Sequence, residues 1–331
     1  MLCLQKIAKS ALFFALFAVS ALGIAQTSGV GSWPTQKPIR LIAVFPPGGS
    51  VDQVARVLAP ALQSELKQNV IVENIGGASG VIGTAAMTRS DPDGYTFAVV
   101  FDTHGVNPSL KDKLPYDTIK DINPVILVGT SPMVLVASKK SGITSFKQLV
   151  DMSKSGKQFS YGSIGIGSLG HLAMARLAKQ AGFDWNHIPY RGGGPLMQDS
   201  LGGQVELAVG SEFLVKPHID SAGVVPLVIT TAKRSPSLPN VPTISESGFP
   251  GFSAPAWWAV LAPGKTPPAI LDAMNKALNK ALKTPAVAEK FKAQGIEIIG
   301  GSSETAREFI GKQVGIWGKF VIENNIKETS Q

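Results

Sequence analysis

The sequence predicts an α/β protein with two lobes, each containing a parallel β-sheet, and a ligand crevice between the lobes. Three observations support this fold class. Apolar runs of strand length alternate with stretches of helical periodicity, which is the order of elements in a parallel sheet covered by helices. About three hundred residues follow an N-terminal leader, which is more than one typical domain. The same succession of strand, glycine-rich loop and helix start also recurs along the chain.

The first 25 residues have the features of a secretory signal peptide. Lys6 and Lys9 are their only charges, a short apolar core follows, and Ala25 ends a small-x-small cleavage pattern. The apolar core is too short to span a bilayer comfortably, so cleavage is favoured over a membrane anchor. Cleavage would remove Cys3, the only cysteine, and we therefore expect an exported protein without disulfides.

The charge balance of the chain is mildly basic. It has 31 Lys and Arg against 23 Asp and Glu, a net charge of +8, and loss of Lys6 and Lys9 lowers this to +6. The basic residues are scattered and do not form runs interleaved with aromatic residues, so nucleic-acid binding is not expected. A modest positive surface would instead help to attract anionic solutes.

The first predicted strand, loop and helix lie within residues 39–68. An apolar run ends at Phe45, Pro46-Pro47-Gly48-Gly49 follows, and helical spacing begins at Ser50. Proline stops strand pairing, glycine lets other atoms approach the backbone, and the first-turn amides of a helix have no partner inside it. The loop therefore predicts a pocket for a carboxylate or phosphate oxygen. Pro60, inside the helix, predicts a kink.

The remaining elements follow in order, and they repeat the design of strand, glycine loop and helix. In the first lobe we expect strands at 70–74, 95–101 and 125–128, a helix at 81–89, and a polar, irregular segment at 102–120. A further strand at 133–137 is expected to lead out of the first lobe. In the second parallel sheet we expect strands at 159–163, 185–190, 205–209 and 225–229, with helices within 141–156, at 168–180 and ending at 201. Beyond a connection at 234–250 we expect strands at 256–261 and 296–299, and helices at 267–283, 285–294 and 303–324. The predicted domains are 26–129 with 252–331, and 130–251.

Two motifs that are typical of cofactors or metals have little support. Gly165-x-Gly167-x-x-Gly170 matches a dinucleotide fingerprint, with Asp184 about twenty residues later. However, Asp184 precedes its strand, whereas the acid of that motif follows one. The four histidines lie in separate segments without paired spacing, and we expect neither a metal nor a cofactor.

The candidate polar contacts carry few charges. His171 could donate to a ligand or hydrogen-bond a nearby loop. Ser163 and Ser168 lack the spacing of a nucleophile motif and are expected to act as hydroxyl donors. Asp52 either lies in a capping position or fixes the loop before it. Arg191, a cation inside a glycine loop, either pairs with a ligand carboxylate or makes an interdomain or surface contact.

Several phrases of the sequence, in order along the chain, carry a family resemblance. They include FPPGGSVDQVARVLA at 45–59, VENIGGASGVIG at 72–83, YGSIGIGSLGHLA at 161–173 and HIPYRGGGPLMQDSLGGQVEL at 187–207. These phrases resemble the Bug-type family of periplasmic solute-binding proteins, the receptors of tripartite tricarboxylate transporters. The resemblance implies a type II periplasmic-binding-protein fold that closes on a carboxylate-bearing solute. The chain departs from the family pattern at Ala175, where a glutamate is usual.

The glycine loops and the resemblance give one set of expected ligand-binding residues. The set is Phe45, Pro46, Gly48, Gly49, Asp52, Gly77, Ala78, Ser79, Asp102, Thr103, His104, Ser163, Gly165, Gly167, Ser168, His171, Arg191 and Gly192. No catalytic residue is expected.

The resemblance implies a non-catalytic periplasmic receptor that captures a small carboxylate by hinge closure and delivers it to membrane permease subunits. We expect it to be a monomer. Two alternatives remain open: a sensor subunit that signals closure to a membrane kinase, and a hydrolase or racemase that uses Asp52, His104 or His171. The sequence does not identify the ligand, because recognition of a carboxylate group does not define the rest of the ligand.

Overall fold

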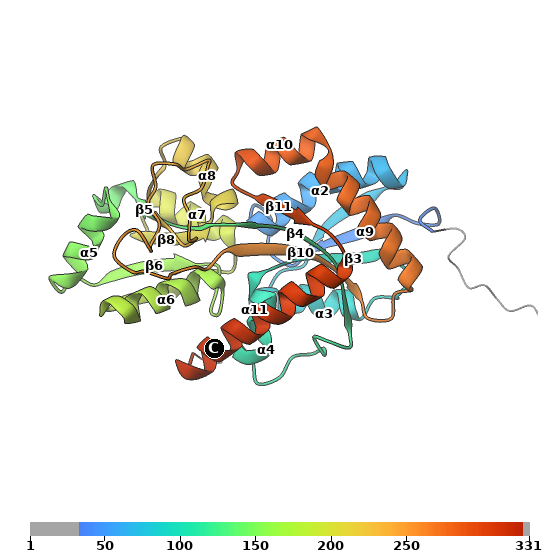
Figure 1. Cartoon of the computed structure of the whole chain (residues 1–331), viewed down its shortest axis with the longest axis horizontal. Helices are drawn as coiled ribbons and strands as arrows, with labels where there is room; N and C mark the ends of the chain where they lie inside the picture. Colours follow the sequence, from blue (N-terminus) through green and yellow to red (C-terminus); the bar gives the residue numbers. More distant parts are fainter. Residues whose placement is uncertain (1–32, 327–331) are drawn as a thin grey trace, which may run out of the picture. The chain divides into compact units, whose positions relative to one another are not determined.

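The computed structural model describes residues 33–326, and the predicted signal peptide lies outside this range. Residues 34–326 belong to one compact unit. Within the described residues, no helix has both the length and the apolar character needed to span a membrane. The unit contains two β-sheets with helices packed against them, which confirms the predicted two-lobed α/β fold class (Figure 1).

The first lobe is built on a six-stranded sheet of order β11-β4-β10-β3-β1-β2. Its strands are β1 (Ile39–Ala43), β2 (Val70–Asn74), β3 (Thr96–Phe101), β4 (Ile122–Ser131), β10 (Ala256–Pro263) and β11 (Glu297–Gly300). Strands β1, β2 and β3 run parallel, as predicted. Strand β10 is antiparallel to both of its neighbours, and β11 is antiparallel to β4. The sheet is therefore mixed, with its parallel part at the N-terminal strands.

Two groups of helices cover this first sheet. Helices α2 (Ser50–Leu66), α9 (Pro268–Lys283) and α10 (Pro285–Ala293) contact one another, and α4 (Asn107–Leu110) contacts α11 (Ser303–Glu323). Helix α3 (Val81–Thr88) packs on β3, below the strands in the view of Figure 1. Helix α2 continues through Pro60 as one helix. The segment expected to be irregular contains α4 and a short 3-10 helix, Asp102–Gly105.

The second lobe is built on a five-stranded sheet of order β7-β6-β8-β5-β9. Its strands are β5 (Met133–Ser138), β6 (Phe159–Ser163), β7 (Trp185–Pro189), β8 (Leu207–Ser211) and β9 (Val224–Ile229). Strand β6 is parallel to β7 and β8, whereas β5 is antiparallel to β8 and β9. The prediction of a parallel sheet misses β5. This strand follows β4 after a single residue, Pro132, so no crossover helix sets its direction.

The helices of the second lobe are α5 (Phe146–Lys154), α6 (Leu169–Ala181), α7 (Gly193–Gly202) and α8 (Glu212–Asp220). Sequence patterns did not predict α8. Residues 205–215 are apolar apart from Glu206 and the interruption Gly210-Ser211-Glu212, and the apolar stretch after this interruption is too short for helical periodicity to be recognised. Helix α7 begins at Gly193, and Pro195 is therefore its third residue, where the first-turn amide still has no helical partner to lose.

An aromatic cluster joins the two lobes where the chain passes between them. Trp257 and Trp258 of β10 are fully buried. The ring of Phe213, in α8 of the second lobe, lies 6.0 Å from that of Trp258 and 5.8 Å from that of Phe291 in α10. The ring of Phe101, at the end of β3, lies 5.0 Å from Trp258. The cluster therefore connects the second lobe to the middle of the first sheet.

Candidate ligand-binding site

A cavity of about 1040 Å³ lies where loops of the two lobes meet. The first lobe contributes residues 45–47, 74, 76–79 and 82 with residues 110–113, and the second lobe contributes residues 164–166 and 189–191. Most of these loops follow the carboxyl ends of β1, β2, β6 and β7. This is the edge at which open α/β sheets usually place their ligands. The cavity is therefore the candidate binding site.

The loop after β2 forms an unusual turn at the wall of the cavity. Ala78 and Ser79 have φ of 49° and 55°, in the left-handed region, and Gly77 and Gly80 also have positive φ. Two consecutive left-handed residues with side chains cost about 1–2 kcal/mol each. Within the described part of the chain, the amides of Ala78 and Ser79 have no hydrogen-bond acceptor. Successive amides in such a turn form a concavity suited to an anion.

Asp52 fixes the loop after β1 from the side that faces away from the cavity. Its carboxylate accepts from the amide of Gly48 at 3.0 Å, from Arg56 Nε at 2.8 Å and from Asn74 Nδ2 at 3.0 Å. Asn74 Nδ2 also donates to the carbonyl of Phe45 at 3.0 Å. Asp52 is buried and does not line the cavity. The carboxylate therefore shapes the loop, and the amide of Gly48 is already engaged.

A buried hydrogen-bond network supports the loop after β6. Ser163 Oγ lies 2.7 Å from His187 Nε2 and accepts from Ser168 Oγ at 3.1 Å. The amide of Gly167 donates to His171 Nδ1 at 3.1 Å, and the rings of His171 and His187 stack with centroids 4.0 Å apart. Burial lowers the pKa of His171 to about 4. Burial, and then the neighbouring His171, lower the pKa of His187 to about 3. Both rings are therefore neutral at ordinary pH.

The buried residues Asp102, Thr103 and His104 lie at the end of β3, outside the set that lines the cavity. Asp102 Oδ1 accepts from the amide of Leu169, the first residue of α6 in the second lobe, at 3.2 Å. Burial raises the pKa of Asp102 to about 8, although hydrogen bonds from Leu169 and Thr103 oppose the shift. Burial also lowers the pKa of His104 to about 4, and its Nδ1 has no partner among the described residues.

A second hydrogen bond joins the lobes beside the cavity. Ser79 Oγ donates to the carbonyl of Ile166 at 3.1 Å. A Cβ built on Gly167 would lie 2.2 Å from Leu110 Cδ2, so the loop after β6 also packs closely on α4 of the first lobe. The loop is thus contacted from the first lobe at several points.

Cationic side chains lie around the same cavity. Arg191 and Lys113, both exposed, line it together with Lys111 and Asp112. Tyr190 also lines it, and its hydroxyl donates to Asp199 at 2.9 Å. The lining therefore combines uncharged loop backbone with cations that could approach an anionic ligand.

The structure divides the sequence-predicted site residues into two groups. Those that line the cavity are Phe45, Pro46, Gly77, Ala78, Ser79, Gly165 and Arg191. Those that lie outside the lining are Gly48, Gly49, Asp52, Asp102, Thr103, His104, Ser163, Gly167, Ser168, His171 and Gly192. Several of the second group hold the lining loops in place, and contact of any of these residues with a ligand stays a prediction.

Sequence patterns missed other lining residues. Tyr190 directly precedes the glycine loop at Arg191, and its place at the end of a predicted strand was a usable signal. Residues 110–113 belong to the stretch expected to be irregular, and no motif marks them. Their place at the cavity depends on how α4 packs on the rest of the first lobe.

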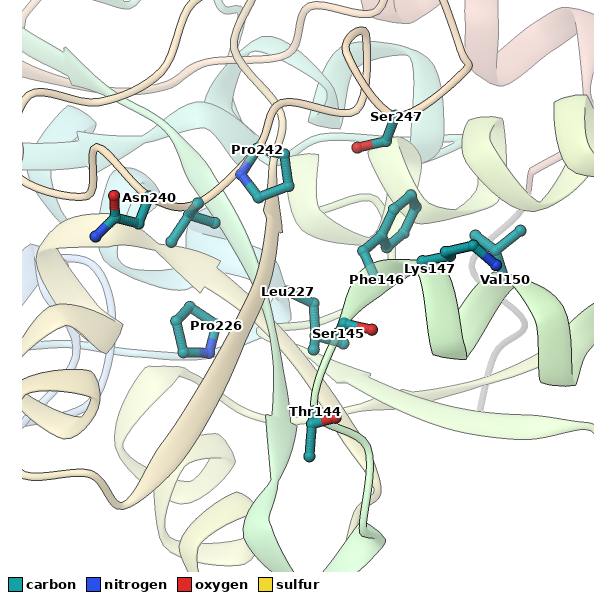
Figure 2. A pocket seen from close by; sticks show the side chains of 11 residues that line it. Thr144, Ser145, Phe146, Lys147, Val150, Pro226, Leu227, Asn240, Pro242 and Ser247 are labelled. Carbon is teal, nitrogen blue, oxygen red and sulfur yellow. The ribbon is translucent and has the colours of Figure 1, made fainter.

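A second cavity, of about 550 Å³, lies within the second lobe. Figure 2 shows its lining side chains, with Phe146 and Lys147 at the start of α5 opposite Pro226 and Pro242. None of the sequence-predicted site residues lines it. Among residues 33–326 there is also no group of three or more metal-ligating side chains suited to a metal ion.

These features define the class of a two-lobed α/β binding protein whose site is formed by loops of both lobes. Residues 54–326 match the family model described as the tripartite tricarboxylate transporter family receptor, and the chain belongs to this family. The family consists of solute-binding receptors rather than enzymes, and the Bug-type resemblance is confirmed.

Related proteins agree with this assignment. The chain is 38% identical over 312 residues to protein BugT of Bordetella pertussis, covering 93% of this chain and 95% of that protein. A structure of an R. palustris protein with adipate is 30% identical with a TM-score of 0.86, covering 89% of this chain and all of that one. MatC from Rhodopseudomonas palustris with bound malate is 27% identical with a TM-score of 0.81, covering 87% and 99%.

Proposed function

We propose that this protein captures a small carboxylate, and in particular a dicarboxylate, in the cavity between its lobes. The observation that carries the proposal is the left-handed turn at Ala78 and Ser79, whose amides have no acceptor in the described chain and lie at the cavity wall. One carboxylate would accept from these amides, and the other would approach Arg191 or Lys113. The adipate and malate bound to the two relatives have this chemistry.

We further propose that binding is accompanied by hinge closure between domain 1, residues 26–129 and 252–331, and domain 2, residues 130–251. The hydrogen bonds from Ser79 to Ile166 and from Leu169 to Asp102 support this proposal, because they join loops of different lobes. Closure would remove the ligand from water and strengthen each polar contact to it.

Calorimetry tests the ligand proposal. The protein should be unfolded and refolded before titration, so that any ligand carried through purification is removed. We expect binding of at least one linear dicarboxylate of three to six carbons with a Kd of about 1 µM or lower. The diamide of the same acid should not bind measurably, since it lacks the charges. Equal affinity for acid and diamide, or silence against the whole panel, would contradict the proposal.

We propose that the receptor is exported and cleaved after Ala25, and that it delivers its ligand to the permease subunits of a tripartite tricarboxylate-type transporter. The family description and the apolar leader support this. N-terminal sequencing of protein from a periplasmic extract should begin at Gln26. Uptake of the labelled acid should require both the receptor and the permease. Uptake that persists without the receptor would argue against delivery.

A further inference from the structure

Two pairs of glycines bring the backbones of the two lobes into contact. Gly48 and Gly49 precede α2 in the first lobe, and Gly193 and Gly194 begin α7 in the second. A Cβ built on Gly49 would lie 3.5 Å from the amide nitrogen of Gly193, and one built on Gly193 would lie 3.3 Å from Cα of Gly49. A Cβ on Gly194 would lie 2.9 Å from the carbonyl oxygen of Pro47. At these points the backbones meet with no side chain between them.

These four glycines do not belong to the lining of the cavity, although Pro46 and Pro47 beside them do. The amide of Gly48 is bonded to the carboxylate of Asp52 within the first lobe. A Cβ built on Gly192 would lie 3.0 Å from Cδ of Pro46, so the close contact extends to the edge of the cavity. Contact with the first lobe accounts for glycine at position 194, whereas Gly48 has a positive φ of 81° and a Cβ on Gly193 would first meet Leu214 Cδ2 of its own lobe at 2.7 Å.

A substitution at Gly194 would change the contact between the lobes without disturbing the fold of either lobe. It lies in α7, and its φ is not positive. The three atoms nearest to a Cβ at this position belong to Pro47 and Gly48, all in the first lobe. Alanine has a higher helix propensity than glycine, so alanine at position 194 suits the second lobe by itself. Its methyl group would collide only with the other lobe.

We propose that Gly48, Gly49, Gly193 and Gly194 form a closing seam, which sets how far the two lobes can approach around a bound ligand. The proposal rests on the receptor function proposed above. Contacting backbones packed at native density have no space for an added methyl group at the tightest point. One methyl group there would hold the lobes apart and weaken binding, because ligand affinity depends on the population of the closed form.

The affinity test uses adipate as the probe and three single substitutions. We expect Gly194→Ala to weaken adipate binding by about tenfold or more while the melting temperature of the ligand-free protein stays equal or rises. Gly202→Ala, in the same helix, is the matched control, because its nearest contact is Gln204 Cγ at 3.8 Å. Gly49→Ala places its Cβ at an ordinary contact distance and should keep affinity within about threefold. Equal affinity in Gly194→Ala and the wild type would overturn the seam.

A measurement of the distance between the lobes tests the closing-seam proposal independently of which ligand binds. Spin labels at the exposed positions of Lys154 in the second lobe and Lys276 in the first report the separation of the lobes. We expect the distance distribution of Gly194→Ala to shift to longer values than that of the wild type, with or without adipate. Unchanged distributions would overturn the seam. If the wild type binds no carboxylate, this result counts against the proposed function alone. The distances measured without ligand still test the closing-seam proposal.

Discussion

The backbone amide of Leu169 donates to Asp102 Oδ1 at 3.2 Å, so a carboxyl of the first lobe occupies the N-terminus of helix α6 in the second. The first amides of a helix have no acceptor within the helix itself. Here the chain supplies that acceptor itself. An anionic ligand is therefore not needed at this helix, whereas the amides of Ala78 and Ser79 in the cavity wall have no acceptor in the described chain.

Replacement of Asp102 by asparagine should change how stability depends on pH. Burial raises the pKa of Asp102 to about 8, so the folded protein holds a proton that the unfolded chain, with its ordinary pKa of 3.8, releases. The wild type should therefore lose stability relative to Asp102→Asn as pH rises from about 4 to about 8. Urea unfolding of both proteins between pH 5 and pH 8.5 measures this difference. Parallel stability curves would show that Asp102 is not buried as a neutral acid.

Substitutions at Ser79 should separate backbone strain from contact between the lobes. Ser79→Gly relieves a left-handed φ of 55°, which should raise stability by about 1 kcal/mol, but it removes the hydrogen bond to Ile166. Ser79→Ala removes the same bond and keeps the strain. Both variants should release the bound acid faster, and only the glycine variant should melt higher. Stopped-flow measurement of ligand release and thermal unfolding test these expectations. An unchanged release rate in both variants would show that the hydrogen bond from Ser79 to Ile166 does not stabilise the closed form.

Much of the fold follows from the sequence because glycine and proline residues clearly mark its loops. The Pro-Pro-Gly-Gly loop before Ser50 and the glycine loop before Leu169 fall where helices α2 and α6 begin. Helix α8 had a weaker signal, since only Gly210 and Ser211, inside strand β8, mark its start, and its apolar stretch at Phe213 is short. The direction of β5 was also unreadable, because strand order is set by long-range pairing rather than by local pattern.

The candidate site was predictable at the level of loops but not of atoms. The sequence leaves two roles for Asp52, capping of α2 or fixing of the loop before it, and the structure shows its carboxylate accepting from the amide of Gly48 in that loop. By contrast, His171 of α6 stacks on His187 of β7, sixteen residues later in the chain. The stacking depends on tertiary packing, and sequence spacing carries no record of it.

Truncation of Phe213 should be strongly destabilising. Its ring packs against those of Trp258 and Phe291, at centroid distances of 6.0 Å and 5.8 Å, and it is fully buried. Phe213→Ala would leave a cavity where the lobes join, at a cost of about 3–5 kcal/mol. Phe213→Leu fills part of that space and should cost less. Chemical unfolding monitored by tryptophan fluorescence tests both, and a loss below 1 kcal/mol in Phe213→Ala would contradict this packing argument.

The stacked pair of His171 and His187 should make the protein sensitive to mild acid. Burial lowers both pKa values below the ordinary 6.5, so the unfolded chain takes up protons more readily, and stability present above pH 6.5 is lost as the pH falls toward 4. Protonation would also prevent His171 Nδ1 from accepting the amide of Gly167. His171→Asn keeps an acceptor at this position without a titrating group. Its stability should match the wild type at pH 7.5 and exceed it by about 2 kcal/mol at pH 5. If both proteins lose the same stability over this interval, the acid sensitivity lies elsewhere in the chain.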